Sequence, residues 1–149
     1  MSTPATARER LVGLWRLVSI RERWGVRREA DHPGFGPDPE GRLLYTEAGL
    51  VSVHFMRSRR PPWASEESPT DAERAESAAG YGAYAGRYTV EEAGGFVLHH
   101  VDVALIPNRV GRDLKRFFSF SGNRLTLQPP PVIRDGLELR RSLVWEKEQ

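Results

Sequence analysis

The amino-acid sequence predicts an all-β fold: an antiparallel barrel of about eight strands, with a short N-terminal helix and one inserted helix. Two observations support this fold class. Short apolar runs are separated by hairpin-type turns such as "EAG" (47–49) and "GN" (122–123). Within several runs, apolar residues recur at every second position. Strands in this number pack as a sandwich or close into a barrel, whose interior is filled by side chains or holds one small ligand.

The expected elements begin with a disordered segment and a short helix. Residues 1–5 are expected to be disordered, and Thr6 is the expected N-cap of the helix that follows. A strand is predicted over 14–24, and the Pro- and Gly-rich stretch 26–41 is predicted to be a loop. The other expected strands are "RLLYT", "LVSVHFM", "RYTVEE", "FVLHHVDVAL", "DLKRFFSFS", "RLTLQ" and "LELRRSLVWEK".

A linker and a helix, together residues 57–84, are expected to interrupt the series of strands. The linker "RSRRPPWASEESP" is irregular, basic first and then acidic. The Ala-rich stretch after it begins with a capping pair, which predicts a helix over about 70–84. No internal repeat or composition change marks a second domain, so residues 1–149 are expected to form one domain.

Composition excludes several classes of protein. Of the 149 residues, 39% are hydrophobic and 28% charged, which suits a soluble globular domain, and a net charge of +2 gives no indication of nucleic-acid binding. The absence of cysteine excludes disulfides, cysteine-based zinc sites and thiol catalysis. No apolar stretch is long enough to cross a bilayer and the N-terminus has no apolar signal-peptide core, so a cytoplasmic location without a membrane partner is expected. No phosphate-binding loop occurs and His99 and His100 point to opposite faces of a strand, so no cofactor or metal is expected.

Several motifs carry a family resemblance. "LVGLWRLVS" contains Gly13 and Trp15 in the Gly-x-Trp opening of the lipocalin fold. The segments "FGPDPEGRLLYTEAGLVSVHFMR", "AYAGRYTV", "LHHVDVALIPNRVGR", "RFFSF", "NRLTLQPPP" and "RSLVWE" follow in order. From about Leu11 to Trp145 the chain thus resembles the bacterial and fungal lipocalin-like domain family. The resemblance implies a cup-like, calycin-type barrel that encloses small hydrophobic molecules; some related small barrels are cofactor-free cyclases or isomerases of natural-product pathways. Without a signal peptide or cysteines, the chain departs from secreted lipocalins, which argues against an extracellular carrier.

Alternation along the strands predicts which polar residues enter the barrel. Tyr45 shares a face with Leu43, and His99 shares a face with valines and a leucine over 97–105. Arg116 shares a face with Leu114, Phe118 and Phe120. Arg141 shares a face with leucines and a tryptophan of the last strand. Each of these faces is expected to point inward.

The strand "VSVHFM" has two faces that suit an interior. Ser52, His54 and Met56 lie on one, and the apolar Val51, Val53 and Phe55 on the other. We expect the Ser52, His54 and Met56 face to line the cavity; in the inverse arrangement His54 is a surface residue and the site reduces to Arg116 and His99.

Four side chains are the candidate catalytic residues: Tyr45, His54, His99 and Arg116. In a dry chamber an arginine holds a carboxylate or enolate oxygen, a neutral histidine moves a proton, and a tyrosine donates to an oxyanion. The candidate ligand-binding residues are Ser52, Met56, Tyr84, Phe118, Phe120 and Arg141.

Structural roles compete with each of these assignments. Arg141, or its neighbour Arg140, could stack on Trp15 at the closed end of the barrel. Arg116 could pair with a carboxylate at the barrel rim. His54 and His99 could be histidines whose hydrogen bonds are satisfied within the protein.

Two functions fit this pattern. The first is binding of a small hydrophobic or amphipathic molecule, for instance in secondary metabolism; the second is a cofactor-independent cyclase or isomerase acting on a polyketide- or terpenoid-like intermediate in the same cavity. A weaker third possibility is a protein-interaction module that uses the 57–69 loop. A homodimer would be permitted by exposed strand edges.

Overall fold

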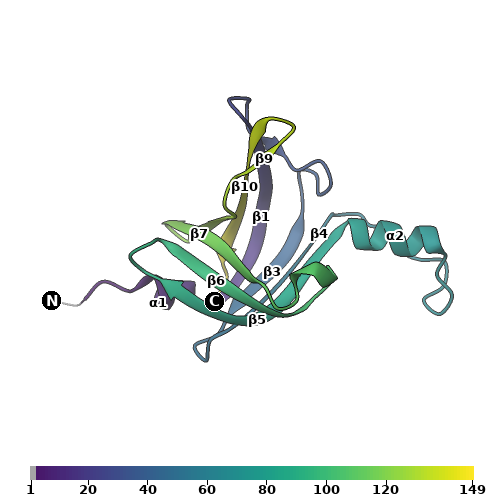
Figure 1. The fold of residues 1–149 in the computed structure, drawn as a ribbon. Helices are drawn as coiled ribbons and strands as arrows, with labels where there is room; N and C mark the ends of the chain where they lie inside the picture. The colour runs from purple at the N-terminus through teal and green to yellow at the C-terminus, as the bar shows by residue number, and fades with distance from the viewer. Residues whose placement is uncertain (1–2) are drawn as a thin grey trace.

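The structure, a computed structural model, describes residues 3–149 and is an antiparallel barrel with helices at both ends (Figure 1). The elements are α1 (Ala7–Leu11), β1 (Gly13–Trp24), β2 (Ala30–Asp31), β3 (Glu40–Tyr45), β4 (Leu50–Met56), α2 (Asp71–Ala79), β5 (Tyr81–Glu91), β6 (Phe96–Ala104), the 3₁₀ helix η1 (Pro107–Arg109), β7 (Asp113–Ser121), β8 (Arg124–Gln128), β9 (Val132–Arg134) and β10 (Leu137–Lys147).

The sheet closes on itself. Its order is β2-β1-β3-β4-β5-β6-β7-β8-β10-β9, and β1 also pairs with β10 from Trp15↔Lys147 to Trp24↔Leu139. Of the ten strands, β2 and β9 are short additions beside β1 and β10, and the other eight form the barrel. The expected eight-stranded antiparallel barrel, with its N-terminal and inserted helices, is therefore confirmed.

Helix α1 seals one end of the barrel. Thr6 caps it by accepting a hydrogen bond from the Glu9 N–H, as the sequence predicts, and Leu11 is fully buried under it. The Trp15 indole N–H donates to the Leu11 carbonyl at 2.8 Å. Nζ of Lys147 lies over the Trp15 ring, 4.9 Å from its centroid. Residues 3–5 precede the helix as exposed chain without regular structure, and residues 1 and 2 lie outside the described residues.

The opposite end is open. There β6 and β7 stay paired only from Phe96↔Phe117 to His100↔Asp113. Helix α2 begins with a capping box between Thr70 and Glu73, as predicted, but buries none of its residues and projects away from the barrel (Figure 1). No helix within residues 3–149 combines the length and apolar character needed to cross a membrane.

The inserted helix is shorter than the sequence suggests. The expectation of helix to about residue 84 is wrong: α2 ends at Ala79 and β5 begins at Tyr81. The "GYGAYAGRY" segment alternates as a strand, and it pairs with β4 from Met56↔Tyr81 onward. The predicted loop 26–41 also contains β2, and β9 lies in the "PPPVIRDG" loop.

A β-bulge changes the facing of β6 near its end. Gly86 pairs with Val101 and Ala85 with Val103, so Asp102 is an extra residue on β6. Val101 is therefore buried, whereas Val103, expected on the same inward face, is 63% exposed. A Cβ on Gly86 would lie 1.8 Å from the His100 carbonyl oxygen, which explains the glycine opposite this bulge.

We expect Leu11→Ala to lower the free energy of unfolding by about 2–5 kcal/mol, because it leaves a cavity in the seal under α1. The matched control is Leu44→Ala in β3, whose side chain is already 42% exposed. Urea denaturation measures the free energy of unfolding of both variants, provided that the m-value, its dependence on urea concentration, is unchanged. Equal losses in the two variants would contradict this role of Leu11.

Candidate functional site

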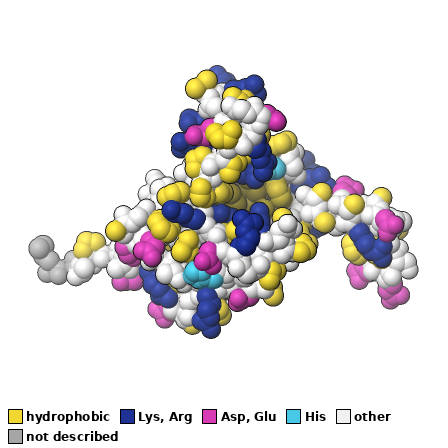
Figure 2. Space-filling model, viewed as in Figure 1, with side chains coloured by type: hydrophobic (Ala, Val, Ile, Leu, Met, Phe, Trp, Pro, Cys, Tyr) yellow, Lys and Arg dark blue, Asp and Glu magenta, His cyan; other side chains and the backbone are white. Residues whose placement is uncertain are grey.

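The barrel encloses a cavity of about 380 Å³ that opens at the α2 end. Figure 2 shows a hollow with a hydrophobic floor and with Lys and Arg side chains at its rim. The apolar wall includes Ile20, Leu43, Val53, Phe55, Leu127 and Leu143. A cavity of this size suits a small organic molecule rather than a polymer.

Loop residues border the mouth. Phe35, from the loop after β2, packs on Phe55 with ring centroids 5.3 Å apart. Ala79 of α2 and Ile106 before η1 also line the cavity. The mouth is thus built from segments that follow the strands, while the wall behind it is rigid sheet.

A buried histidine lies between two tyrosines on the cavity wall. The Tyr45 hydroxyl is 2.6 Å from Nε2 of His99, and the Tyr84 hydroxyl is 2.6 Å from Nδ1. Burial lowers the pKa of His99 to about 3, and the positive charge of Arg116 acts in the same direction. Burial also raises the pKa values of both tyrosines. At neutral pH His99 is therefore neutral and both phenols are protonated, and the predicted inward facing of Tyr45 and His99 is confirmed.

Two arginines line the cavity beside this cluster. Arg116 enters from β7, as predicted, and Arg109 enters from η1. Nη1 of Arg116 donates to the Lys115 carbonyl at 2.9 Å. Within residues 3–149 neither arginine pairs with a carboxylate, so the expected alternative of a rim ion pair for Arg116 is wrong. Burial lowers the pKa of Arg109, and the neighbouring Arg116 lowers it further.

A third arginine in the cavity has a partner. Nε of Arg141 donates to Oε2 of Glu22 at 2.6 Å, and Glu22 is 5% exposed. Nε2 of His32 lies 3.7 Å from the same oxygen. Stacking of Arg141 or Arg140 on Trp15 is therefore a wrong expectation, because Glu22 holds Arg141 and Lys147 lies over the Trp15 ring.

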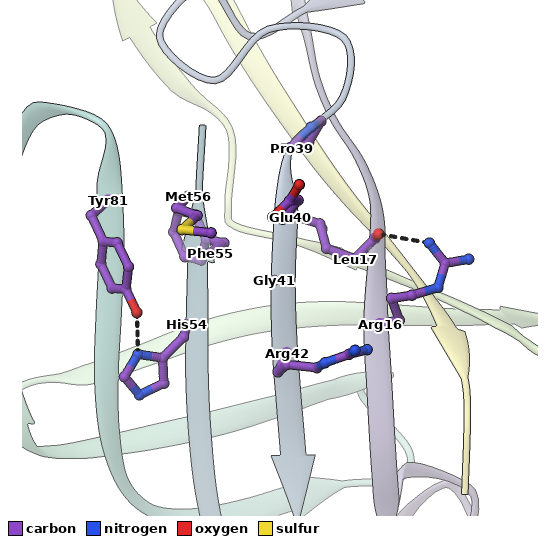
Figure 3. A pocket seen from close by; sticks show the side chains of 10 residues that line it. All are labelled: Arg16, Leu17, Pro39, Glu40, Gly41, Arg42, His54, Phe55, Met56 and Tyr81. Atoms are coloured by element: carbon purple, nitrogen blue, oxygen red, sulfur yellow. Dashed lines mark hydrogen bonds between the residues drawn. The ribbon is translucent and has the colours of Figure 1, made fainter. Parts of the chain in front are cut away.

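The predicted inward face of β4 is wrong. Val51 and Val53 are buried, whereas His54 is exposed, so Ser52, His54 and Met56 face outward. The cause is the register with β3, which aligns Val53 with buried Leu43. His54 and Met56 border a separate outer hollow of about 450 Å³, where Nδ1 of His54 meets the Tyr81 hydroxyl at 2.7 Å (Figure 3).

The remaining predicted ligand-binding residues divide into two groups. Tyr84 and Arg141 line the cavity. Phe118 and Phe120 face inward, as predicted, but they pack against the core towards α1, where the Arg10 guanidinium lies 4.0 Å from the Phe120 ring centroid. They support the sealed end and are not part of the cavity wall.

Sequence reasoning missed Glu22, His32, Phe35 and Arg109. Alternation in "SIRERW" places Glu22 on the face of Ile20 and so could have found it. His32 and Phe35 lie on a loop and Arg109 lies on the single 3₁₀ turn η1, where no periodicity indicates which way a side chain points. Within residues 3–149 no cluster of three His, Cys, Asp or Glu residues is placed to hold a metal ion.

We expect His99 to make the protein acid-sensitive. The unfolded chain binds a proton at this histidine below about pH 6.5, whereas the folded protein does so only near pH 3. The contribution to stability is complete above pH 6.5 and is lost as the pH falls towards 3, by about 1.4 kcal/mol per pH unit for a single group. Urea unfolding across this window should give a shallower pH slope for His99→Gln. Exposed His54→Gln should keep the wild-type slope, and equal slopes in all three proteins would contradict the assignment.

Comparison with known proteins agrees with this geometry. Residues 12–148, nearly the whole chain, match the lipocalin-like domain family. The chain is also similar to the 4'-hydroxy-3'-methoxypropiophenone carrier protein ppsC of Aspergillus oryzae, with 33% identity over 106 residues that span 65% of this chain and 96% of the relative. The family resemblance carried by Gly13, Trp15 and the later segments is thus confirmed: the chain belongs to the lipocalin-like domain family.

Proposed function

We propose that this protein binds a small organic molecule in the barrel cavity, with an apolar body against the wall and an oxygen atom at the polar cluster. The observation that carries the proposal is the combination of an apolar wall with Tyr84, Arg109 and Arg116 in one enclosed space. Apolar burial contributes about 25 cal/mol per Å² of buried area, and a few placed polar groups fix the ligand's orientation.

The relative from Aspergillus oryzae supports a carrier role. Its name states that it carries a propiophenone, a small aromatic ketone with hydroxyl and methoxyl groups. A ligand of that chemical class has the flat apolar body and the acceptor oxygens that this cavity would accommodate. We extend the proposal to secondary metabolism as the setting for such a ligand.

The site favours binding over acid–base catalysis. A general base must exchange a proton with its substrate, but both ring nitrogens of His99 are already bonded to tyrosines. His54, the other candidate proton shuttle, lies outside the barrel. A cyclase or isomerase using this cavity would have to rely on Tyr84 and Arg116 as oxyanion donors and on confinement of the substrate. For such an enzyme Arg116→Ala would reduce turnover far more than binding, whereas a carrier would show only the loss of binding.

Native mass spectrometry tests the binding proposal directly. Protein purified from its producing cells without denaturation should carry one small organic molecule per chain, which dissociates when the protein is unfolded. The probe for calorimetry is acetonaphthone, a small aromatic ketone. A protein that is consistently free of ligand and also fails to bind this probe would contradict the proposal.

A cavity-filling substitution provides the second test. Val53, 4% exposed on the cavity wall, is replaced by phenylalanine, and the control is the same substitution at Val103, which is 63% exposed. The larger side chain in the cavity should lower the affinity for acetonaphthone by about tenfold or more, because it occupies the ligand's volume. Val103→Phe should keep the wild-type affinity. Equal affinities in both variants, with both folded by circular dichroism, would locate binding elsewhere.

A further inference from the structure

The hydrogen-bond directions around His99 follow from what surrounds each tyrosine. A neutral imidazole has one N–H donor and one acceptor nitrogen, so one tyrosine donates to the ring and the other accepts from it. Tyr45 is fully buried and, within residues 3–149, its hydroxyl has no other hydrogen-bond partner than His99. If Tyr45 accepted from His99, its own O–H would be buried without an acceptor.

The proton positions are therefore assigned. Tyr45 donates to Nε2, and the Nδ1–H of His99 donates to the Tyr84 oxygen. The O–H of Tyr84, which lines the cavity, is then free to donate to a ligand. Tyr45 and His99 act as positioning residues for this hydroxyl.

The other free polar groups of the cavity are also donors. Arg109 and Arg116 present guanidinium groups that have no carboxylate partner within residues 3–149. Trp145 lines the same cavity at 1% exposure, and its indole N–H has no hydrogen-bond partner within the described residues. The nearby carboxylate, Glu22, is already held by Arg141. Half-buried guanidinium groups at an apolar wall are only partly hydrated, so this arrangement suits a ligand that supplies acceptors.

We propose that the cavity binds its ligand as an organic anion, with a carboxylate or an ionised phenol or enol oxygen between Arg116, Arg109 and the Tyr84 hydroxyl. This inference rests on the binding function proposed above and narrows the ligand from any oxygen acceptor to an anionic one. Two guanidinium groups that repel each other gain from a negative charge placed between them, and a neutral carbonyl oxygen would leave both charges uncompensated.

The summed charge of the side chains at the cavity also favours an anion. The charged and titratable side chains at the cavity are His32, Tyr81, Tyr84, His99, Arg109, Arg116 and Arg141, together with Glu22 behind the wall. The negative charge of Glu22 cancels the positive charge of Arg141. His32 and His99 are neutral because burial lowers both of their pKa values. A net positive charge from Arg109 and Arg116 remains.

Calorimetry with matched probes separates charge from shape. Naphthoate and acetonaphthone, substituted at the same ring position, share one apolar body and differ in having a carboxylate or a methyl ketone. Wild-type protein should bind naphthoate about tenfold or more tightly than acetonaphthone at neutral pH. Comparable affinities for the two would exclude a carboxylate as the bound group and leave the binding function intact; the anion assignment itself would be overturned if para-nitrophenol also showed no stabilised phenolate in the test described below. Binding of neither probe would overturn both.

Arginine variants test which residues hold the anion. Arg116→Gln should lower naphthoate affinity about tenfold and acetonaphthone affinity much less, because glutamine still donates a hydrogen bond to a neutral oxygen but carries no positive charge. Exposed Arg112→Gln makes the same charge change outside the cavity and should alter neither affinity. Equal effects of the two variants would mean that only the overall field of the protein attracts the anion, which contradicts a built site.

A phenol that changes colour on ionisation distinguishes the two kinds of anion. Bound para-nitrophenol should keep its phenolate absorbance at pH values where the free compound is protonated, because the guanidinium groups lower its pKa. Naphthoate preference without this change assigns the site to carboxylates, and the change alone assigns it to ionised phenols. The absence of both overturns the proposal.

Nitrogen-15 NMR of the His99 ring tests the proton positions. The wild type should show a protonated Nδ1 and an unprotonated, hydrogen-bonded Nε2. Tyr45→Phe removes the donor to Nε2, and the ring should then populate the Nε2–H form and naphthoate affinity should fall severalfold. Observation of the Nε2–H form in the wild type would mean that Tyr84 donates to His99 and not to the ligand, which overturns the role of Tyr84.

Discussion

The hydrogen-bonded pairing of β1 with β10 is the constraint on which the rest of the structure depends. It joins the first long strand to the last and so gives each of the eight barrel strands one face that points to the interior. If this pairing were missing, the sheet would have two open edges, and the histidine and tyrosines on its inner face would be exposed to water. Closure therefore supplies the burial that keeps His99 neutral. The seal formed by α1, with Trp15 donating to Leu11, then confines the open space to the other end.

The polar lining of the cavity has two parts with different electrostatic character. Around Glu22 the charges are matched within the protein, since Arg141 donates to its carboxylate and His32 lies near the same oxygen. Around Arg116 and Arg109, no carboxylate within residues 3–149 matches the positive charges. Even partial burial of a guanidinium group costs desolvation free energy, which a matching carboxylate would offset. The imbalance at one end of the cavity is thus best understood as a property of the ligand that completes it.

The sequence was sufficient for the fold but only partly for the site. Alternation predicted the barrel and the inward facing of Tyr45, His99 and Arg116, because each lies among aliphatic or aromatic residues of one strand. Alternation failed for His54, because both faces of β4 are apolar enough to line an interior. Only the register with β3 determines which face points inward. Alternation could not find Arg109, which lies on the short 3₁₀ helix η1, whose position depends on tertiary packing. Periodicity reports which residues share a face, and it carries no information on which face is inside when both are suitable.

The open rim of the cavity affects how stable the protein is when no ligand is bound. Arg109 lies on η1, a single 3₁₀ turn, and within residues 3–149 neither it nor the neighbouring Arg116 pairs with a carboxylate. Like charges held close together repel each other, and a ligand that binds only the folded state stabilises the fold by mass action. Local opening, and with it proteolysis, would then be most frequent in protein without a bound ligand. Under the proposed binding function, the abundance of the protein would thus follow the supply of its ligand, without any separate regulator.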